Sequence, residues 1–470
     1  PKEKVYQLIT DYAHLEQLSD SIKSSQILKQ TTPNEIQVKS VSEGCIFFIC
    51  QTITQVQYIH QLDNGYIHIE VEPTLSDLKL NNQLWHIEAI ENKNCSSVAA
   101  IGTETKAGQG CGSCRGAIAQ IISSVVGEVA YDASEHYYVP GIPLEKSQLV
   151  REIRSQALKS VSDVLAILGE GMEDPTTKTG LASLLKTLWP KMYEDQRDAR
   201  FINDRVHANI QKDGTFSVVP RIVAGVTTPE ALLRIAQAAV KYKAKMVKFT
   251  GGQRIDLLGI KKEDLPDIWK DIDLPSGHAY TKAFRTVKSC VGTDFCRFGL
   301  GDSISLAEQV ELRFQGIEAP HKVKMAVTGC PRNCAEAYIK DIGVVAIEGG
   351  KWELYIGGAA AATIRKGDLL CTVDSHEDVL KYTSRFFEYY REHAKYLERT
   401  YGFVERIGID LLKGILVDDS LGICATLEEK MQEAVDAYQD PWKEAEDPVY
   451  PFQFEGPKLI EILEKAENNG

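Results

Sequence analysis

The chain has 470 residues, of which 43% are hydrophobic and 25% charged, a composition typical of a globular protein with two or three domains. The formal net charge of -13 argues against nucleic acid or an acidic membrane surface as a partner. No apolar run of about 18 residues predicts a membrane span, and the first residues lack a signal-peptide pattern. The chain begins at Pro1 rather than Met, which predicts a fragment or a processed protein.

The 11 cysteines indicate metal ligation rather than disulfides. Their number is odd, several stand in close pairs, and no signal peptide is present, which favours a reducing compartment. We therefore expect a cytoplasmic protein, with an organelle stroma as the alternative. Apolar neighbours predict core or sheet-edge packing for four of the cysteines: Cys45, Cys50, Cys371 and Cys424.

Residues 1–92 are predicted to form a separate α+β domain. Val5, Leu8, Ile9 and Tyr12 follow a helical period. Short β-rich runs with turn signals come next: NEIQVKSV, CIFFICQTITQVQYI, GYIHIEVEP and NQLWHIEAI. A helix followed by a curved antiparallel sheet resembles the helix-grip fold of the START/polyketide-cyclase-like superfamily. The resemblance implies a lipid- or partner-binding module, although the long closing helix of that fold is not found here.

Residues 98–150 have a different character and contain Cys111 and Cys114 after a glycine-rich turn and before a predicted helix. The segment resembles the second half of a bacterioferritin-associated-ferredoxin-like [2Fe–2S] domain. Such a cluster needs four thiolates, and the family takes two from an upstream Cys-x-Cys pair that this chain lacks. A segment missing near 91–98, recruitment of Cys45 and Cys50, and a vestigial turn without a cluster remain open. Cys95 is the one cysteine close by.

Residues 151–204 are predicted to be a helical linker and residues 205–280 a ferredoxin-like half-domain. The Lys-Asp-Gly turn at 212–214 predicts a hairpin. Thr228, followed by Pro229, predicts a helix N-terminus. A strand, a Gly-Gly-Gln turn, a second strand and a helix should complete this half-domain.

Residues 281–430 are predicted to be a mixed α/β domain, followed by an acidic, peripheral tail over 431–470. A helix is expected over 303–317 and a hairpin with a Gly-Gly turn over 343–358. A long amphipathic helix is expected over 376–400. The fold class is therefore α+β.

Two cysteine pairs among cations carry the most chemical information. Cys290 and Cys296 have five residues between them, and Cys330 and Cys334 have three. Basic residues flank both pairs: Arg285, Lys288, Arg297, Lys322, Lys324 and Arg332. Four thiolates are the usual ligands of a [4Fe–4S] cluster. Structural zinc prefers about two to four intervening residues, so the wider first pair counts against it. Four unlinked buried thiols are the remaining alternative.

The motifs around these pairs resemble a known family over residues 98–450. They are HANIQKDGTFSVVPRI, FTGGQRIDLLGI, RTVKSCVGTDFCRFGLGDS, APHKVKMAVTGCPRNCAEA and DDSLGICATLEEKM. Together they resemble the sirohaem domains of the large subunit of assimilatory nitrite reductase, within the sulfite/nitrite reductase superfamily. The resemblance implies sirohaem coupled to a [4Fe–4S] cluster and the six-electron reduction of nitrite to ammonium. Reduction of sulfite to sulfide and a non-catalytic electron-transfer or haem-binding subunit are the alternatives.

The resemblance also implies roles for single residues. Cys334 would bridge the cluster to the sirohaem iron. Arg285, Lys322 and Lys324 would line the pocket of the substrate anion and supply protons. Lys322 and Lys324 alternate on a predicted strand and should face one side. Basic residues on a solvated face are the alternative interpretation.

Other residues are predicted to contact sirohaem or the anion. Where the superfamily often has Thr-Thr-Arg-Gln, this chain has Thr250, two glycines and Gln253, and its arginine is displaced to Arg254. Arginine suits the haem carboxylates because it binds them bidentately. Arg221 is a further candidate for the anion pocket. The remaining predicted cofactor contacts are Arg297, Arg332 and Asn333, whereas His278 is predicted to be structural.

Two features of the family are not found in the sequence. The superfamily commonly places two copies of this unit around one sirohaem, and only one copy is found here, which predicts a homodimer. No G-x-G-x-x-G fingerprint is present. FAD and NAD(P)H would therefore act through a missing region or a partner flavoprotein, unless a ferredoxin is the electron donor.

Overall fold

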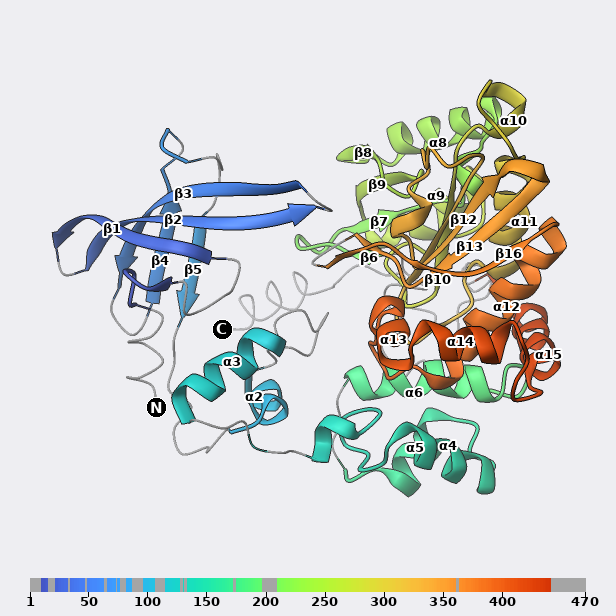
Figure 1. The fold of residues 1–470 in the computed structure, drawn as a ribbon, viewed down its shortest axis with the longest axis horizontal. Helices are drawn as coiled ribbons and strands as arrows, with labels where there is room; N and C mark the ends of the chain where they lie inside the picture. The colour runs from blue at the N-terminus through green and yellow to red at the C-terminus, as the bar shows by residue number, and fades with distance from the viewer. Residues whose placement is uncertain are drawn as a thin grey trace, which may run out of the picture. The chain divides into compact units, whose positions relative to one another are not determined.

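The computed structural model has a mixed α+β fold and divides into two compact units, Pro1–His136 and Tyr137–Gly470 (Figure 1). It describes residues 10–15, 22–32, 34–46, 49–62, 66–72, 74–76, 82–86, 96–105, 115–126, 130, 133–171, 175–196, 209–360 and 363–440. No described helix is both long and apolar enough to cross a membrane.

The first unit contains an antiparallel meander of five strands, in the order β1-β2-β3-β4-β5. Its strands are β1 (Ile22–Thr32), β2 (Glu35–Ile46), β3 (Ile49–Gln61), β4 (Tyr66–Val71) and β5 (Asn82–His86). Alternate apolar residues, among them Val38, Ile59 and Ile67, pack with Tyr12. The meander agrees with the predicted sheet, whereas most of the predicted N-terminal helix lies outside the described residues. The unit also has the helices α2 (Val98–Thr105) and α3 (Arg115–Val126) and the 3-10 helix η3 (Ala133–His136).

The second unit begins with three helices, α4 (Lys146–Ser155), α5 (Val161–Leu168) and α6 (Pro175–Leu188). They share an apolar core that includes Leu149, Ile153 and Leu185. The ammonium of Lys146 donates hydrogen bonds to the carbonyls of Arg391 and Ala394, at 2.8 and 2.7 Å. These bonds cap the end of a long helix of the same unit.

A four-stranded antiparallel sheet with two helices follows, in the strand order β6-β7-β9-β8. The elements are β6 (Asn209–Ile210), β7 (Phe216–Val218), η4 (Val223–Gly225), α8 (Pro229–Lys241), β8 (Met246–Phe249), β9 (Ile255–Ile260), η5 (Lys262–Asp264) and α9 (Leu265–Ile272). The hydroxyl of Thr228 accepts a hydrogen bond from the Ala231 amide, which is the N-cap that the sequence predicts. The hairpin of β6 and β7 is likewise present.

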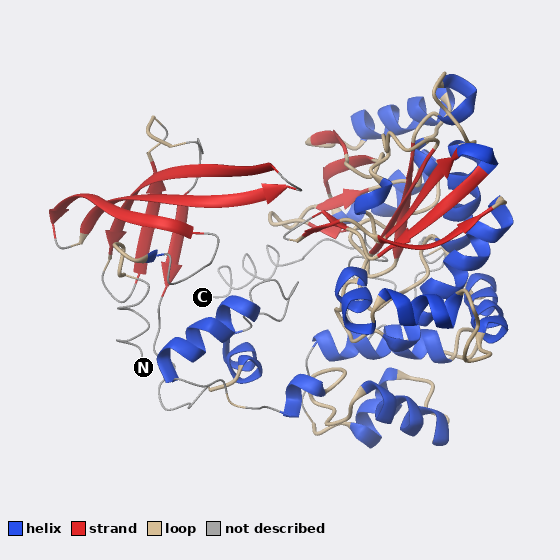
Figure 2. Ribbon diagram, in the orientation of Figure 1, coloured by secondary structure: helices blue, strands red, loops and turns tan. Residues whose placement is uncertain are grey.

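The second five-stranded sheet, in the second unit, has the order β10-β11-β12-β13-β16 and is drawn in red beside blue helices in Figure 2. Its strands are β10 (Phe284–Ser289), β11 (Val323–Thr328), β12 (Ile342–Ile347), β13 (Lys351–Ile356) and β16 (Asp368–Val373). The first three run parallel, and the last two are antiparallel to their neighbours. Strand β10 is therefore an edge of this sheet.

The helices that cover this sheet and the short elements between them are α10 (Gly292–Phe295), α11 (Ser303–Phe314), η6 (Ala337–Ile339), η7 (Glu348–Gly350), β14 (Ala359–Ala360), β15 (Ile364–Arg365), α12 (His376–His393), α13 (Thr400–Ile407), α14 (Ile409–Leu416) and α15 (Cys424–Asp436). Phe284, Phe314 and Phe387 pack together in the core. The predicted helix over 376–400 ends at His393, where Lys146 caps it. The predicted start of the tail at 431 falls inside α15, whose Met431 is buried in the core.

Candidate active site

Two cysteine-bearing loops follow neighbouring parallel strands. Cys290 follows β10 directly, and Cys330 stands two residues after the end of β11. Because parallel strands end at the same edge of a sheet, both loops are brought to one place. Cys330 is buried, Cys290 and Cys296 are half-buried, and Cys334 is exposed.

Glycines allow the two loops to contact each other through their backbones. The amides of Leu300 and Gly301 donate to the carbonyl of Gly329, at 2.7 and 3.2 Å. A Cβ on Gly329 would lie 2.9 Å from the carbonyl oxygen of Gly301, and a Cβ on Gly299 would lie 2.9 Å from the backbone of Gly292. A side chain at Gly329 would push the two loops apart, and one at Gly299 would distort the first loop. The glycines of both cysteine motifs therefore hold the two pairs together.

The sulfur of Cys290 lies in a cradle of hydrogen-bond donors. The Gly329 amide donates to it at 3.1 Å, and the Ser303 hydroxyl lies 3.3 Å away. Burial raises the pKa of this thiol, but hydrogen bonds from Ser303, Gly329, Gly292 and Thr328 outweigh burial and lower the pKa below its usual value. The surroundings thus favour the thiolate, the form that binds iron.

An aromatic ring joins the two loops on another side. The guanidinium of Arg332 lies 3.8 Å from the centre of the Phe298 ring, and that of Arg297 lies 4.9 Å from it. Asn333 has a left-handed backbone, and its side chain accepts a hydrogen bond from the Tyr338 amide. These three predicted cofactor contacts thus have roles in shaping the loops, and their contact to a cofactor stays a prediction.

The donor set of the two loops is four thiols, the usual ligands of a [4Fe–4S] cluster. Within residues 209–360 and 363–440, and elsewhere in the described chain, no three Cys, His, Asp or Glu residues are arranged to hold one metal ion. A structural zinc site would bring its four ligands to about 2.0–2.3 Å from one centre. A [4Fe–4S] cluster binds each thiolate to a different iron, so its ligands stand further apart. The two locked loops, with their four thiols, suit that arrangement.

Four cations gather at the start of β10 and β11. Val323 and Met325 are fully buried, whereas Lys322 and Lys324 are half-buried and face the other side of β11, as their alternation predicts. Thr286 pairs with Lys324 across the strands, so Arg285 lies close by. Burial lowers the pKa of Lys324 to about 8, and the charges of Arg285, Lys322 and Arg254 add to this effect. The positive charges of these side chains therefore repel one another, and the cluster is suited to bind an anion.

Arg254 reaches this cluster from the turn between β8 and β9. The hydroxyl of Thr250 accepts hydrogen bonds from the Gly252 and Arg254 amides and closes the turn. Arg254 is buried and donates to the Gly277 carbonyl, while its Nε has no hydrogen-bond partner among the described residues. A buried guanidinium with an unpaired donor fits a carboxylate of the haem. The carboxamide of Gln253 is instead bound to the backbone of Ser289.

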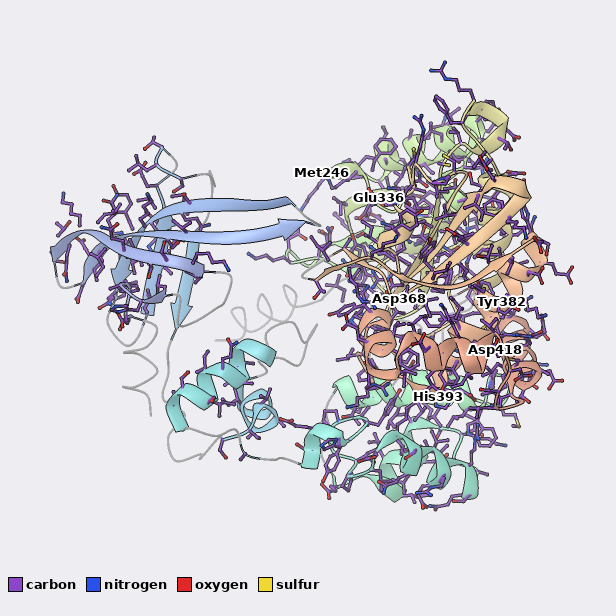
Figure 3. All side chains as sticks on the ribbon, in the orientation of Figure 1. Met246, Glu336, Asp368, Tyr382, His393 and Asp418 are labelled. Atoms are coloured by element: carbon purple, nitrogen blue, oxygen red, sulfur yellow. The ribbon has the colours of Figure 1, made fainter. Side chains whose placement is uncertain are left out.

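Two other cations near the motifs are engaged elsewhere. Arg221 donates to the hydroxyl of Tyr438 at 2.8 Å. The same hydroxyl lies 2.5 Å from His278, in keeping with the structural role predicted for that residue. Lys288 pairs with Glu336, which is labelled in Figure 3, at 3.1 Å. The prediction that Arg221 acts in the anion pocket gains no support from these contacts.

Two buried residues beside the cations were not predicted. Asp341 accepts hydrogen bonds from the Lys324 amide at 2.9 Å and from Arg399 at 3.1 Å. Burial, together with Arg399, Lys322, Lys282 and Arg285, lowers the pKa of His321 to about 3, so its imidazole stays neutral. His321 stands next to Lys322 in sequence and could have been suspected. Asp341 carries no local signal, because strand pairing alone brings it to Lys324.

Comparisons with known proteins agree with this geometry. The family model described as nitrite and sulphite reductase 4Fe-4S domain matches residues 280–422, and the nitrite/sulfite reductase ferredoxin-like half domain matches residues 209–274. The assimilatory-type sulfite reductase of Nitratidesulfovibrio vulgaris is 35% identical over 207 residues, which are 44% of this chain and 94% of that protein. The chain belongs to the nitrite and sulphite reductase family.

A BFD-like [2Fe-2S] binding domain model also matches residues 87–124. Cys111 and Cys114 fall in this range, but they lie outside the described residues.

Longer members of the family are also similar. The nitrite reductase [NAD(P)H] of Bacillus subtilis is 45% identical over 361 residues, which are 76% of this chain and 44% of that protein. The nitrite reductase (NADH) large subunit of Escherichia coli is 38% identical over 364 residues, which are 75% of this chain and 42% of that protein. The chain therefore spans less than half the length of these two relatives.

Proposed function

We propose that this chain carries the reaction centre of a sirohaem/[4Fe–4S] reductase that converts nitrite to ammonium. The observation that carries the proposal is that two features share the neighbouring strands β10 and β11, with the cations at the strand starts and the cysteine loops after the strand ends. One is the pair of glycine-locked loops with the four thiols, and the other is the cluster of cations around Lys324. The long relatives named nitrite reductase favour nitrite as the substrate.

The cations have defined tasks in this proposal. Bound sirohaem would supply the iron that binds the anion, and the cluster would supply electrons. Arg285 and Lys322 balance the charge of the anion. Lys324, with a pKa near 8, holds a proton at neutral pH and releases it more readily than an ordinary lysine. Cys334 is the exposed member of the four cysteines, which suits a thiolate shared with a second group.

Sulfite is the second candidate substrate. One observation favours it: the match to this chain covers nearly the whole length of the assimilatory-type sulfite reductase. The test is to record the visible spectrum of the purified protein and then supply reduced viologen with each anion. Haem bands and ammonium from nitrite would support the proposal. Sulfide from sulfite with slow nitrite turnover would support the second candidate, and a spectrum without haem bands would refute both.

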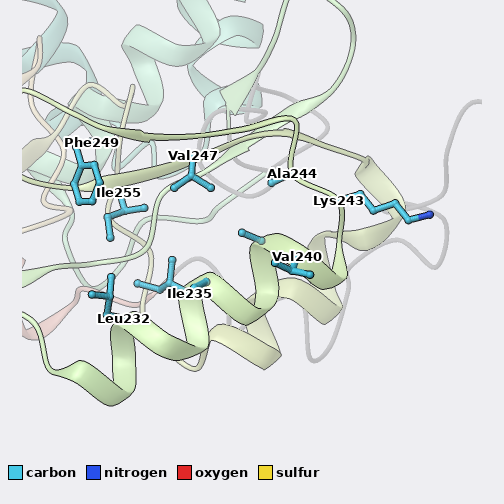
Figure 4. Close-up of a pocket in the computed structure, with 10 residues that line it drawn as sticks. Leu232, Ile235, Val240, Lys243, Ala244, Val247, Phe249 and Ile255 are labelled. Carbon is cyan, nitrogen blue, oxygen red and sulfur yellow. The ribbon is translucent and has the colours of Figure 1, made fainter.

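We also propose a homodimer. Strand β8 is an edge strand with exposed apolar side chains, and Phe249 is 77% exposed. A groove of about 510 Å³ between β8 and α8 is lined by Leu232, Val240 and Val247, and Figure 4 shows these side chains. Exposed apolar edges of this kind mark association surfaces. Light scattering of the haem-loaded protein tests the proposal, and an active monomer would refute it.

The electrons are proposed to come from NAD(P)H through an FAD-containing domain or partner, because two of the relatives carry NAD(P)H or NADH in their names. Cys111 and Cys114 are proposed to bind a [2Fe–2S] cluster on this route, in the segment that the BFD-like model matches. We further propose that the protein acts in the cytoplasm. Iron and sulfide contents of the wild type and a Cys111→Ser variant test the second cluster.

A further inference from the structure

Strand β10 carries Arg285 and leads directly to Cys290, yet it lies at the edge of its sheet. An edge strand has backbone groups without a neighbouring strand on one side. In β10 these outward groups belong to alternate residues, Arg285, Val287 and Ser289. Their hydrogen-bond partners decide how firmly the strand is held.

Side chains take the place of the missing strand. The Ser289 amide donates to Gln253 Oε1, and Gln253 Nε2 donates to the Ser289 carbonyl, both at 2.8 Å. The Val287 amide donates to Glu311 Oε2 at 2.9 Å. The Arg285 carbonyl accepts from Gln315 Nε2 at 2.7 Å. These side chains hold the outer edge of β10 between Arg285 and Ser289, whereas the amide and carbonyl of Phe284 bond to the backbone of Ile317 and Gly316.

Glu311 connects these contacts, because its carboxylate also accepts from the Ala224 amide at 2.8 Å and from Gln315 Nε2 at 3.0 Å. Its side chain is fully buried, and burial raises its pKa to about 7. A buried carboxyl is costly unless its oxygens are well bonded. Glu311 and Gln315 lie one helical turn apart on and just after α11, the helix that joins the two cysteine motifs in sequence.

The strand needs this support most at Arg285. The pairing of β10 with β11 is irregular there, since Phe284 pairs with Val323 and Thr286 with Lys324. One residue of β10 has no counterpart on β11, and such a residue is not fixed by the ladder. The bond from Gln315 fixes its carbonyl instead, while the Arg285 Nε donates to the Thr281 carbonyl at 2.6 Å.

We propose that Glu311 and Gln315 are positioning residues for the anion pocket: they act as a substitute strand that holds Arg285 against Lys324. The inference rests on the proposed function, because Arg285 is assigned there to the anion. Gln315 must be an amide in this arrangement, since its Nε2 faces three acceptors: the Arg285 carbonyl, the Glu311 carboxylate and, at 3.4 Å, the Gly277 carbonyl.

Gln315→Met and Glu311→Gln test the proposal in the haem-loaded protein. Met removes the donor to the Arg285 carbonyl. In Glu311→Gln, the new amide must turn its oxygen toward the Val287 and Ala224 amides, so its NH₂ group faces the NH₂ group of Gln315. Loss of a buried hydrogen bond suggests a rise of about tenfold in KM for nitrite. Glu308→Gln and Gln309→Met, also on α11, are matched controls, because no hydrogen bond or ion pair is found for either residue in the described part of the chain.

A double-mutant cycle separates positioning from general destabilisation. If Gln315 acts through Arg285, then Gln315→Met should change KM about tenfold in the wild type and hardly at all in Arg285→Ala. An equal effect in both backgrounds, or an unchanged KM in Gln315→Met, would overturn the proposal. Amide exchange of the 284–290 segment should also be about tenfold faster in both test variants than in the controls.

The exchange measurement keeps this inference separate from the proposed function. If the wild type reduces neither nitrite nor sulfite, the proposed function fails. Faster exchange of the 284–290 segment in the two test variants would then still show that these side chains hold the strand. Exchange at the control rate would show that they do not, whatever the activity.

Discussion

Replacement of Lys324 by methionine should stabilise the protein while it impairs the proposed reaction. Methionine has nearly the shape of lysine but no charge, so it relieves the crowding of cations around Lys324. Burial and the charges of Arg285, Lys322 and Arg254 lower the Lys324 pKa from its usual 10.5 to about 8. At about 1.4 kcal/mol for each tenfold change in proton affinity, charged Lys324 destabilises the fold by about 3 kcal/mol at pH 7.

The sign of the pH dependence follows from the lowered pKa. The folded protein binds the Lys324 proton more weakly than the unfolded chain does. The penalty is therefore complete below pH 8 and disappears as the pH rises from about 8 to 10.5, because folded Lys324 becomes neutral. Without haem, Lys324→Met should exceed the wild type in stability by about 3 kcal/mol at pH 7 and by much less at pH 10.

Denaturant unfolding of the haem-free protein at several pH values is the assay. Lys270→Met is the matched control, because Lys270 lies on α9, is exposed and stands outside the proposed dimer surface. The control should change stability little at any pH. The reasoning is refuted if Lys324→Met is no more stable than the wild type at pH 7, or if its gain does not shrink as the pH rises. A gain in stability together with a loss of activity is expected here, because charges that are clustered for function often lower the stability of the fold.

Three further changes test other parts of the site. Gly301→Ala would place a Cβ 2.6 Å from the Trp352 ring, so we expect a loss of about 1–3 kcal/mol in unfolding free energy and a lower iron content; wild-type values would contradict the glycine packing. Arg332→Lys keeps the charge but loses the flat contact with Phe298, and should cost about 0.5–1 kcal/mol in denaturant unfolding, whereas no loss would argue against that contact. Lys324→Arg keeps the charge but holds its proton, so kcat for nitrite should fall about 100-fold with little change in KM, and an unchanged kcat would exclude Lys324 as a proton donor.

Local patterns predicted much of the second unit. The Thr228 cap, the hairpin before it and the alternation of Lys322 and Lys324 each depend on neighbours in sequence, and all three are found in the structure. The nearness of the two cysteine pairs follows from β10 and β11 being parallel neighbours. A βαβ pattern with α11 between them is enough to suggest that arrangement.

The parts that escaped prediction depend on contacts between distant segments. The pairing of the Gln253 amide with Ser289, 36 residues away, has no signal in the sequence, and contact of Gln253 with the cofactor stays a prediction. Glu311 resembles any other helix glutamate in sequence, and only the fold shows that it lies buried beside Val287. Arg221 likewise donates a hydrogen bond to Tyr438, near the end of the described chain, and no local pattern indicates this contact. Periodicity and motif spacing carry no information about such contacts.

The central claim is that the four cysteines hold a cluster joined to the haem through Cys334. The most direct test is ammonium production from nitrite with reduced viologen by the wild type, Cys334→Ser and Cys371→Ser. Cys371 lies on β16, outside the two loops, and serves as the control. We expect turnover by the wild type and by Cys371→Ser, and none by Cys334→Ser. Turnover by Cys334→Ser at the wild-type rate would contradict the claim.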